Sequence, residues 1–98
     1  MDFHDAIYLQ LAHIPYGHVT SYGSLAKKAG FPNHSRHVGN LLKKLPQDSI
    51  LPWYRVVNSQ RKISFAENSP AYKRQKEKLE AEGITFLRGR ILPEFFVD

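Results

Sequence analysis

Apolar side chains recur at the spacing of an α-helix near the start of the chain. In residues 2–13 they fall on one helical face, and acidic side chains at the start suit the positive end of the helix dipole. The apolar positions are Phe3, Ala6, Ile7 and Leu11, continued by Ile14. Pro15-Tyr16-Gly17 follows, and proline lacks the amide hydrogen that a continuing helix needs. We therefore predict an amphipathic first helix that packs on the core.

Two more helices are predicted on either side of a glycine. Ser21 can cap a helix over 22–29, and Gly30 can end it in the left-handed conformation. The next helix starts at Pro32-Asn33 and runs to about Lys44. Its inner face carries Val38, Leu41, Leu42 and Leu45. Two short helices joined by a tight glycine turn are typical of a helix-turn-helix.

The outer face of this third helix is polar and basic. Arg36, Asn40 and Lys43 follow one another at i, i+4 and i+7, so they lie along one stripe. Gly39 lies in the same stripe and leaves room for the close approach of another backbone. The stripe is therefore a candidate surface for nucleic acid.

The second half of the chain predicts a small hairpin and one further helix. Residues 49–57 are expected to be extended, and a turn at 58–60 leads from a strand at 56–57 to a second strand at 62–65. Ser69-Pro70 opens a solvent-facing helix that runs to Glu82 and is ended by Gly83. The apolar tail, residues 84–98, is expected to wrap the core. The predicted fold class is mainly α with a small β-hairpin, similar to a winged helix.

Length and charge narrow the possible functions. We expect 98 residues to form a single domain, 1–98, and to be monomeric. No long apolar run or secretory leader is present, which predicts a cytoplasmic protein. Residues 18–62 hold eight basic residues and one acidic residue, so the net charge of this region alone exceeds the +5 of the whole chain. This basic region favours a nucleic-acid partner, and a basic surface that only maintains solubility is the alternative.

The chain lacks the residues that several kinds of chemistry need. The chain contains no cysteine, which removes thiolate nucleophiles, disulfides and cysteine-bound metals. Nucleophile-elbow and phosphate-binding glycine motifs are absent. His34 and His37 lie at i, i+3, but a third metal ligand is not evident. We therefore expect no metal, no cofactor and no conventional enzyme activity.

The segment Pro52-Trp53-Tyr54-Arg55 is unusual, because the only tryptophan stands beside a cation within the basic region. Trp53 could be a buried anchor of the core, which is the common role of a lone tryptophan. It could instead present a flat apolar surface to a nucleic-acid base. The segment by itself leaves both interpretations open.

The motifs of the chain, in order and spacing, resemble the C-terminal domain of O6-alkylguanine-DNA alkyltransferases. The resemblance covers residues 3–86 and rests on His18-Val19-Thr20-Ser21-Tyr22-Gly23-Ser24-Leu25-Ala26, Gly30-Phe31-Pro32, Ser35-Arg36-His37-Val38-Gly39 and Pro52-Trp53-Tyr54-Arg55-Val56-Val57. Those enzymes carry a cysteine where this chain has Trp53. The chain is therefore similar to the alkyltransferase-like proteins, which recognise the lesion without repairing it.

The resemblance implies roles for the helix-turn-helix. Tyr22 matches the tyrosine that crowds the phosphate beside the target nucleotide and helps to rotate it out. Arg36 matches the arginine that enters the base stack, and Gly39 matches the glycine that lets the helix approach the minor groove. With Asn40 and Lys43, these residues form the predicted DNA-binding set.

The resemblance also implies a lesion pocket. Glu82 matches the glutamate of a hydrogen-bond relay whose histidine is Tyr54 here, so a Tyr54–Glu82 contact would be only structural. Phe65 is a candidate lid residue or a core residue. Ala66 stands where some relatives have a basic lid residue, so a cation over the purine must come from elsewhere. The predicted pocket residues are Tyr22, Pro52, Trp53, Tyr54, Arg55 and Phe65.

The function that the resemblance implies is non-enzymatic. The chain would bind O6-alkylguanine in duplex DNA through the minor groove, flip it into the pocket beside Trp53 and flag it for nucleotide excision repair. Its partners would be the damaged duplex and nucleotide excision repair proteins. The alternative is a sequence-specific or architectural helix-turn-helix protein that does not recognise lesions.

Overall fold

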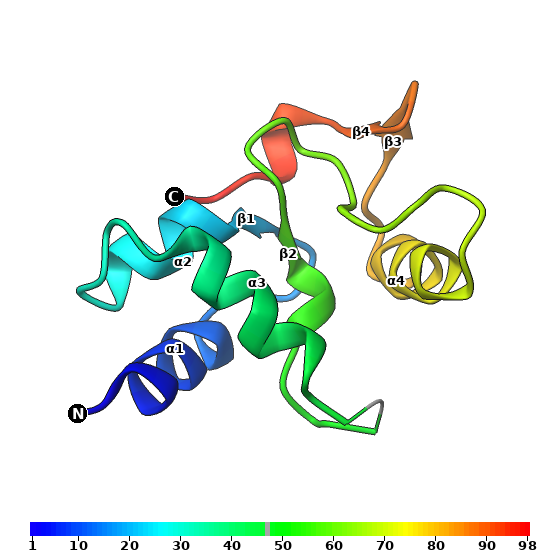
Figure 1. Cartoon of the computed structure of the whole chain (residues 1–98). Coiled ribbons are helices and arrows are strands. Elements are labelled where there is room, and N and C mark those ends of the chain that lie inside the picture. Colours follow the sequence, from blue (N-terminus) through cyan, green and yellow to red (C-terminus); the bar gives the residue numbers. More distant parts are fainter. Residues whose placement is uncertain (47) are drawn as a thin grey trace.

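The computed structural model describes residues 1–46 and 48–98 and is mainly helical, as predicted. The α-helices are α1 (Phe3–Ala12), α2 (Tyr22–Lys28), α3 (Ser35–Lys43) and α4 (Pro70–Ala81). The strands are β1 (Thr20–Ser21), β2 (Val56–Val57), β3 (Phe86–Leu87) and β4 (Arg90–Ile91), and the 3-10 helices are η1 (Trp53–Arg55) and η2 (Pro93–Phe95). Figure 1 shows α1, α2 and α3 on one side of β2 and α4 on the other. No helix of the described residues has the length and apolar character needed to cross a membrane.

Local capping signals confirm the starts of two helices and the end of one. The Ser21 hydroxyl accepts a hydrogen bond from the Ser24 amide at 3.0 Å, at the start of α2. Ser69 caps α4 in the same way, and Pro70 occupies its first turn. Gly30 has a φ of +93°, which is the left-handed conformation expected after α2.

Helix α3 starts at Ser35, later than predicted. The Phe31 amide donates to the Ala26 carbonyl at 2.9 Å, and the His34 amide donates to the Phe31 carbonyl at 3.0 Å. These bonds close a turn over 31–34 in place of a first helical turn. Helices α2 and α3 pack against each other across this turn, which gives the predicted helix-turn-helix.

Strand β2 separates two hydrophobic cores. Successive side chains of a strand point to opposite faces, so its two valines enter different cores. Val56 packs among α1, α2 and α3 with Ile7, Leu11, Ile14, Leu25, Ala26, Val38, Leu41 and Leu42. Val57 packs with Val19, Ile63, Leu79, Ile84 and Ile91, against α4 and the C-terminal segment. The apolar tail therefore completes the second core, as predicted.

The predicted pairing of 56–57 with 62–65 is wrong. Strand β2 pairs in parallel with β1, with Thr20 opposite Val56, and the antiparallel hairpin is formed by β3 and β4. The Asn58 side chain accepts hydrogen bonds from the amides of Gln60 and Lys62 and closes a tight loop. This loop turns the chain away from β2, whose edge β1 occupies.

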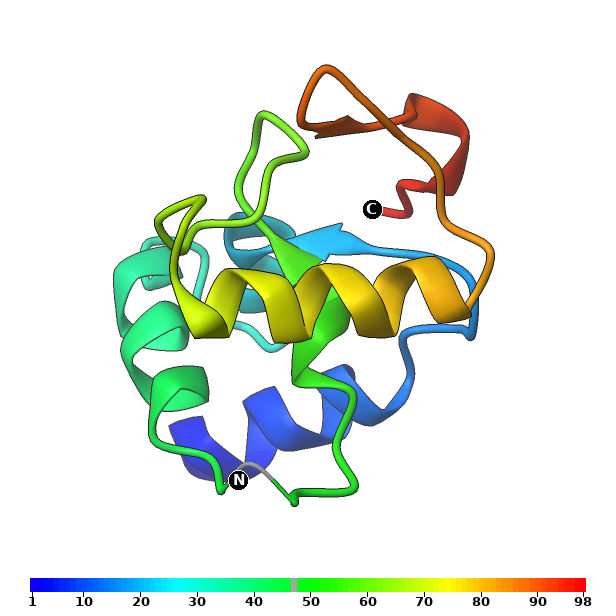
Figure 2. The same cartoon turned by 90° about the vertical axis from the view of Figure 1, so that its right-hand side faces the viewer.

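The structure corrects two further predictions. Trp53–Arg55 forms the 3-10 turn η1, not an extended segment, because Pro52 just before it can precede a helix without losing a hydrogen bond. Helix α4 is not only a solvent-facing support, since its Gln75 is buried and its side-chain amide donates to the carbonyls of Tyr54 and Val56, both at 3.0 Å. Figure 2 shows α4 crossing β2. Gln75 thereby fixes η1 and β2 to this helix.

Candidate nucleic-acid interface

The outer stripe of α3 forms one wall of an open cleft. Val38, Leu41 and Leu42 are buried on the inner face of the helix, which leaves Arg36, Asn40 and Lys43 exposed. The cleft has a volume of about 320 Å³. Its lining is Tyr22, Ser35, Arg36, Gly39, Asn40, Lys43 and Ser64, and we call it the α3 cleft. All five residues of the predicted DNA-binding set therefore lie together.

Tyr22 is held at the back of the α3 cleft. It is the first residue of α2, and its ring lies beside Gly39 of α3. Burial raises the pKa of the Tyr22 hydroxyl, and a hydrogen bond with Ser64 only partly opposes this shift. The hydroxyl therefore stays protonated at neutral pH and can donate a hydrogen bond to an anion such as a phosphate.

A second hollow lies beside Trp53. The indole is only half-buried and is not part of either core. The hollow has a volume of about 360 Å³, within the range of small-ligand sites. Its lining is Leu42, Lys43, Leu45, Pro46, Trp53, Phe65, Ala71 and Arg74, and we call it the Trp53 pocket. Phe65 also packs against the second core, so it serves as both core and wall.

The α3 cleft and the Trp53 pocket are neighbours. Lys43 lines both of them. Ser64 lines the cleft, and the next residue, Phe65, lines the pocket. The two hollows therefore adjoin at Lys43 and at the Ser64-Phe65 segment.

Four predicted pocket residues lie outside the lining of the Trp53 pocket. Pro52, Tyr54 and Arg55 are absent from the lining of the Trp53 pocket, and Tyr22 lines the adjacent α3 cleft. The Tyr54 ring has the Arg55 guanidinium and the Lys78 amine within 5.5 Å and 5.4 Å of its centre. Burial, followed by the nearby Glu82 carboxylate, raises the pKa of Tyr54. Of the six predicted pocket residues, Trp53 and Phe65 line this hollow.

Arg55 is a structural residue that forms an ion pair with Glu82. Its Nη2 lies 2.7 Å from the Glu82 Oε2, and its Nη1 donates to the Ile14 carbonyl at 2.9 Å. The Gly17 amide donates to the other carboxylate oxygen at 2.8 Å. The side chains of Arg55 and Glu82 are only 13% and 6% exposed. Glu82 therefore binds Arg55 and the segment after α1 together, which is a structural role.

Sequence reasoning did not assign pocket residues on α4. Ala71 and Arg74 lie at i, i+3 on this helix, so one face of it reaches the Trp53 pocket. The same spacing was visible in the sequence, but nothing there indicated which face of α4 would meet η1. Arg74 and Lys43 supply the two positive charges of the pocket lining.

Comparisons with known proteins place this geometry in a family. The model of the 6-O-methylguanine DNA methyltransferase, DNA binding domain, matches residues 2–84. A DNA base-flipping protein of Vibrio parahaemolyticus is 53% identical over 78 residues, which are 80% of this chain and 76% of that protein. Alkyltransferase-like protein 1 of Schizosaccharomyces pombe is 40% identical over 83 residues, 85% of this chain and 77% of that protein.

The fold agrees with the sequence match. A crystal structure of S. pombe Atl1 in complex with damaged DNA containing O6-carboxymethylguanine has a TM-score of 0.89 to this chain at 35% identity. The likeness covers 98% of this chain and 94% of that one. Because the family model covers most of the chain and both the sequence and the fold match relatives of this family, the chain belongs to the family of the 6-O-methylguanine DNA methyltransferase DNA-binding domain.

Proposed function

We propose that the chain is a non-enzymatic reader of O6-alkylguanine in duplex DNA. It binds the minor groove through the α3 cleft and rotates the lesion into the Trp53 pocket. The observation that carries this proposal is that the cleft and the pocket adjoin and share Lys43. The names of the relatives, a DNA base-flipping protein and a protein crystallised on O6-carboxymethylguanine DNA, support it.

The side chains of the two hollows suit the separate steps. Tyr22 donates to a backbone phosphate, and Arg36, exposed on α3, fills the place that the base leaves. Flipping costs a few kcal/mol and costs least for a base that already pairs badly, which favours the alkylated guanine. In the pocket the indole offers a flat face, and Arg74 or Lys43 provides the cation that Ala66 does not.

Trp53 makes the complex chemically inert. Alkyl transfer needs a strong nucleophile such as a thiolate, and the indole nitrogen lone pair belongs to the ring. The lesion therefore stays intact while it is bound. We propose that a monomer holds the damaged duplex in this way until nucleotide excision repair proteins act on it.

The experiment that tests the proposal is a titration of matched duplexes with and without O6-methylguanine, followed by fluorescence anisotropy. We expect tighter binding to the damaged duplex, with the methyl group retained on the DNA by mass spectrometry. Equal affinity for both duplexes would reject lesion recognition. Loss of the methyl group would identify an enzyme instead.

Arg36→Ala and a groove-directed competitor complete this experiment. Arg36→Ala should weaken binding to both duplexes, because entry into the groove precedes lesion capture. A minor-groove ligand should displace the protein. Displacement only by a major-groove ligand, together with a preference for base sequence, would favour the helix-turn-helix transcription-factor alternative.

Gly39→Ala is expected to separate folding from DNA binding. A Cβ at position 39 would lie 3.9 Å from the Tyr22 ring, which is an ordinary contact, so the fold itself does not require glycine there. Alanine should stabilise α3 by about 0.5–1 kcal/mol. The added methyl group should nevertheless weaken DNA binding by about tenfold, or about 1.4 kcal/mol, because it holds the backbone away from the groove. Thermal unfolding and anisotropy measure the two effects.

Gly23→Ala is the matched control for this substitution. Gly23 lies in α2 and outside the lining of the α3 cleft, and a Cβ there would meet only the Ser21 hydroxyl, at 4.0 Å. Its DNA binding should match that of the wild type. If Gly39→Ala also binds DNA normally, close backbone approach at α3 is not part of recognition.

A further inference from the structure

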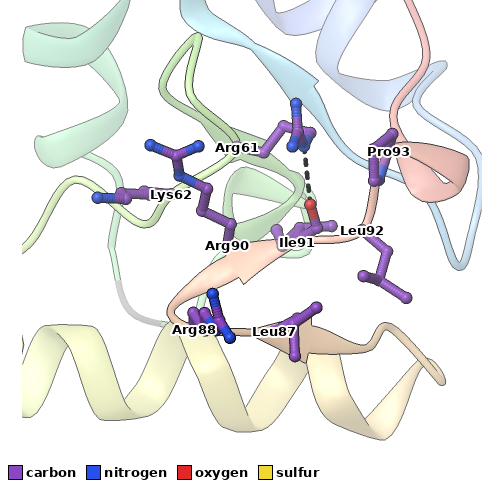
Figure 3. A pocket seen from close by; sticks show the side chains of 8 residues that line it. All are labelled: Arg61, Lys62, Leu87, Arg88, Arg90, Ile91, Leu92 and Pro93. Carbon is purple, nitrogen blue, oxygen red and sulfur yellow. Dashed lines mark hydrogen bonds between the residues drawn. The ribbon is translucent and has the colours of Figure 1, made fainter.

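A third hollow, between the loop that follows β2 and the β3–β4 hairpin, is strongly basic. It has a volume of about 420 Å³. Arg61, Lys62, Arg88 and Arg90 line it, with an apolar wall from Leu87 and residues 91–93. Figure 3 shows the side chains of Lys62 and Arg90 extending to the same side of the hairpin. We call this hollow the cationic pocket.

The two walls of the cationic pocket are fixed to each other. The Ile91 amide donates to the Arg61 carbonyl at 2.8 Å. The Arg61 Nε donates to the Ile91 carbonyl, also at 2.8 Å (Figure 3). Asn58 closes the loop on the other side through the amides of Gln60 and Lys62. Hydrogen bonds therefore tie together the two segments that carry the positive side chains.

Strained backbone conformations coincide with this pocket. Among the described residues, Arg61 and Arg88 are the two non-glycine residues with positive φ, at 63° and 52°. Arg88-Gly89 forms the two-residue turn between β3 and β4, with positive φ at both positions. Asparagine followed by glycine is the favoured sequence for such a turn. An arginine there carries a conformational cost, and strain of this kind is characteristic of functional sites.

The four positive charges have no acidic partner. No acidic side chain lines the cationic pocket. Within the part of the chain that the structure describes, the one ion pair is that of Arg55 and Glu82. Like charges held close together repel each other, and a bound anion removes this repulsion.

The cationic pocket lies close to the proposed DNA path. Lys62 lines it, Ser64 lines the α3 cleft, and Phe65 lines the Trp53 pocket. Two residues of chain span at most about 7 Å. A DNA strand that leaves the α3 cleft past Ser64 would therefore bring a flanking phosphate within reach of Lys62 and the hairpin.

We propose that the cationic pocket binds a backbone phosphate of the DNA that flanks the lesion. This inference rests on the proposed function and extends its footprint. Arg88 and Arg90 lie beyond residues 2–84, the part that matches the family model. Arginine suits the role because its planar guanidinium can bind phosphate through two parallel hydrogen bonds.

The test is Arg88→Asn, which removes one positive charge and gives the turn its favoured sequence, Asn followed by Gly. We expect the midpoint of thermal unfolding to rise or stay constant, while affinity for the damaged duplex falls about tenfold. The slope of log affinity against log salt should decrease by about 0.9, the value of one phosphate contact. Arg90→Gln should cause the same loss of affinity without the gain in stability.

Lys73→Ala is the matched control for charge. Lys73 is exposed on α4 beside Glu67, Glu77 and Glu80, and it is absent from the linings of all three hollows. It should change neither the affinity nor the salt slope. If Arg88→Asn and Arg90→Gln behave like Lys73→Ala while the wild type still prefers the damaged duplex, the phosphate contact is refuted and the proposed function stands. If the wild type shows no such preference, the proposed function itself has failed.

Two further arms identify the source of the phosphate. The first arm compares two duplexes that carry O6-methylguanine near opposite ends of the damaged strand, so that each lacks the DNA on one side of the lesion. The loss of affinity caused by Arg88→Asn should disappear on the duplex that lacks the side contacted by the cationic pocket. An equal penalty on both duplexes would overturn the proposal. The second arm adds inorganic phosphate to the wild type and follows the amide resonances of Arg88 and Gly89 by NMR. If phosphate shifts these resonances while the substitutions leave DNA affinity unchanged, the pocket binds a free anion and not DNA.

Discussion

Glu82→Gln should destabilise the folded chain by about 3 kcal/mol, the largest effect on stability that we expect from one substitution outside the cores. The carboxylate is 6% exposed and receives the Arg55 guanidinium at 2.7 Å and the Gly17 amide at 2.8 Å. The amide of glutamine is neutral and has one oxygen, so the guanidinium, which is only 13% exposed, would remain largely buried without its counter-charge. For a domain of this size, the midpoint of thermal unfolding should fall by roughly 10–20 °C.

The pH dependence of stability gives a second measurement of the same ion pair. Burial alone would raise the pKa of the Glu82 carboxyl, but hydrogen bonds from Arg55 and the Gly17 amide outweigh it and lower the pKa. The ordinary value, about 4.3, applies to the unfolded chain. The carboxylate therefore stabilises the fold fully above that pH, and this contribution is lost as the pH falls through the lower, folded-state pKa.

Urea unfolding across a pH series checks both expectations. The wild type should lose stability on acidification, and Glu82→Gln should lack that part of the dependence. Glu80→Gln is the control, because Glu80 is exposed on the same helix and should alter stability by less than about 0.5 kcal/mol. If Glu82→Gln unfolds like the control, the ion pair does not hold α4 to the segment after α1.

Trp53→Ala should abolish most of the preference for damaged DNA. A base stacked on an aromatic side chain is worth about 1–3 kcal/mol, so affinity for the O6-methylguanine duplex should fall about 5- to 150-fold. Affinity for the undamaged duplex should change little, because Trp53 does not line the α3 cleft. Anisotropy titrations of both duplexes give the ratio directly.

Tyr54→Phe is the matched control for the indole. Tyr54 lies next to Trp53 in η1, but its ring lies outside the Trp53 pocket, with Arg55 and Lys78 as neighbours. The lesion preference of this variant should equal that of the wild type. Parallel losses on damaged and undamaged DNA for Trp53→Ala would show that the indole supports the fold and does not hold the base. Circular dichroism of each variant verifies that η1 substitutions leave the helices intact.

Features that depend on near neighbours in the sequence were predictable. The caps at Ser21 and Ser69 and the left-handed Gly30 each involve residues within one turn of a helix. The stripe of α3 follows from helical spacing alone, so Arg36, Asn40 and Lys43 were placed on one face correctly. The absence of cysteine in the sequence likewise excludes a thiolate acceptor.

Features that join distant segments were not predictable in the same way. Two valines favour a strand, but they do not say whether its partner is 62–65 or Thr20–Ser21, since either offers free backbone groups. The loop closed by Asn58 decided this competition. Arg55 could have faced the pocket or Glu82, and only the approach of the end of α4 determined which.

The amino-acid sequence by itself thus determined the helix-turn-helix, its basic outer stripe and the absence of any cysteine. Tertiary structure decided which side chains share a hollow: Lys43 with Trp53 and Arg74 in one, and Arg61 with Arg88 in another. The physical reason is range. Capping and helical periodicity act within a few residues, whereas a pocket is formed by segments that meet only after chain closure and core packing have oriented every element.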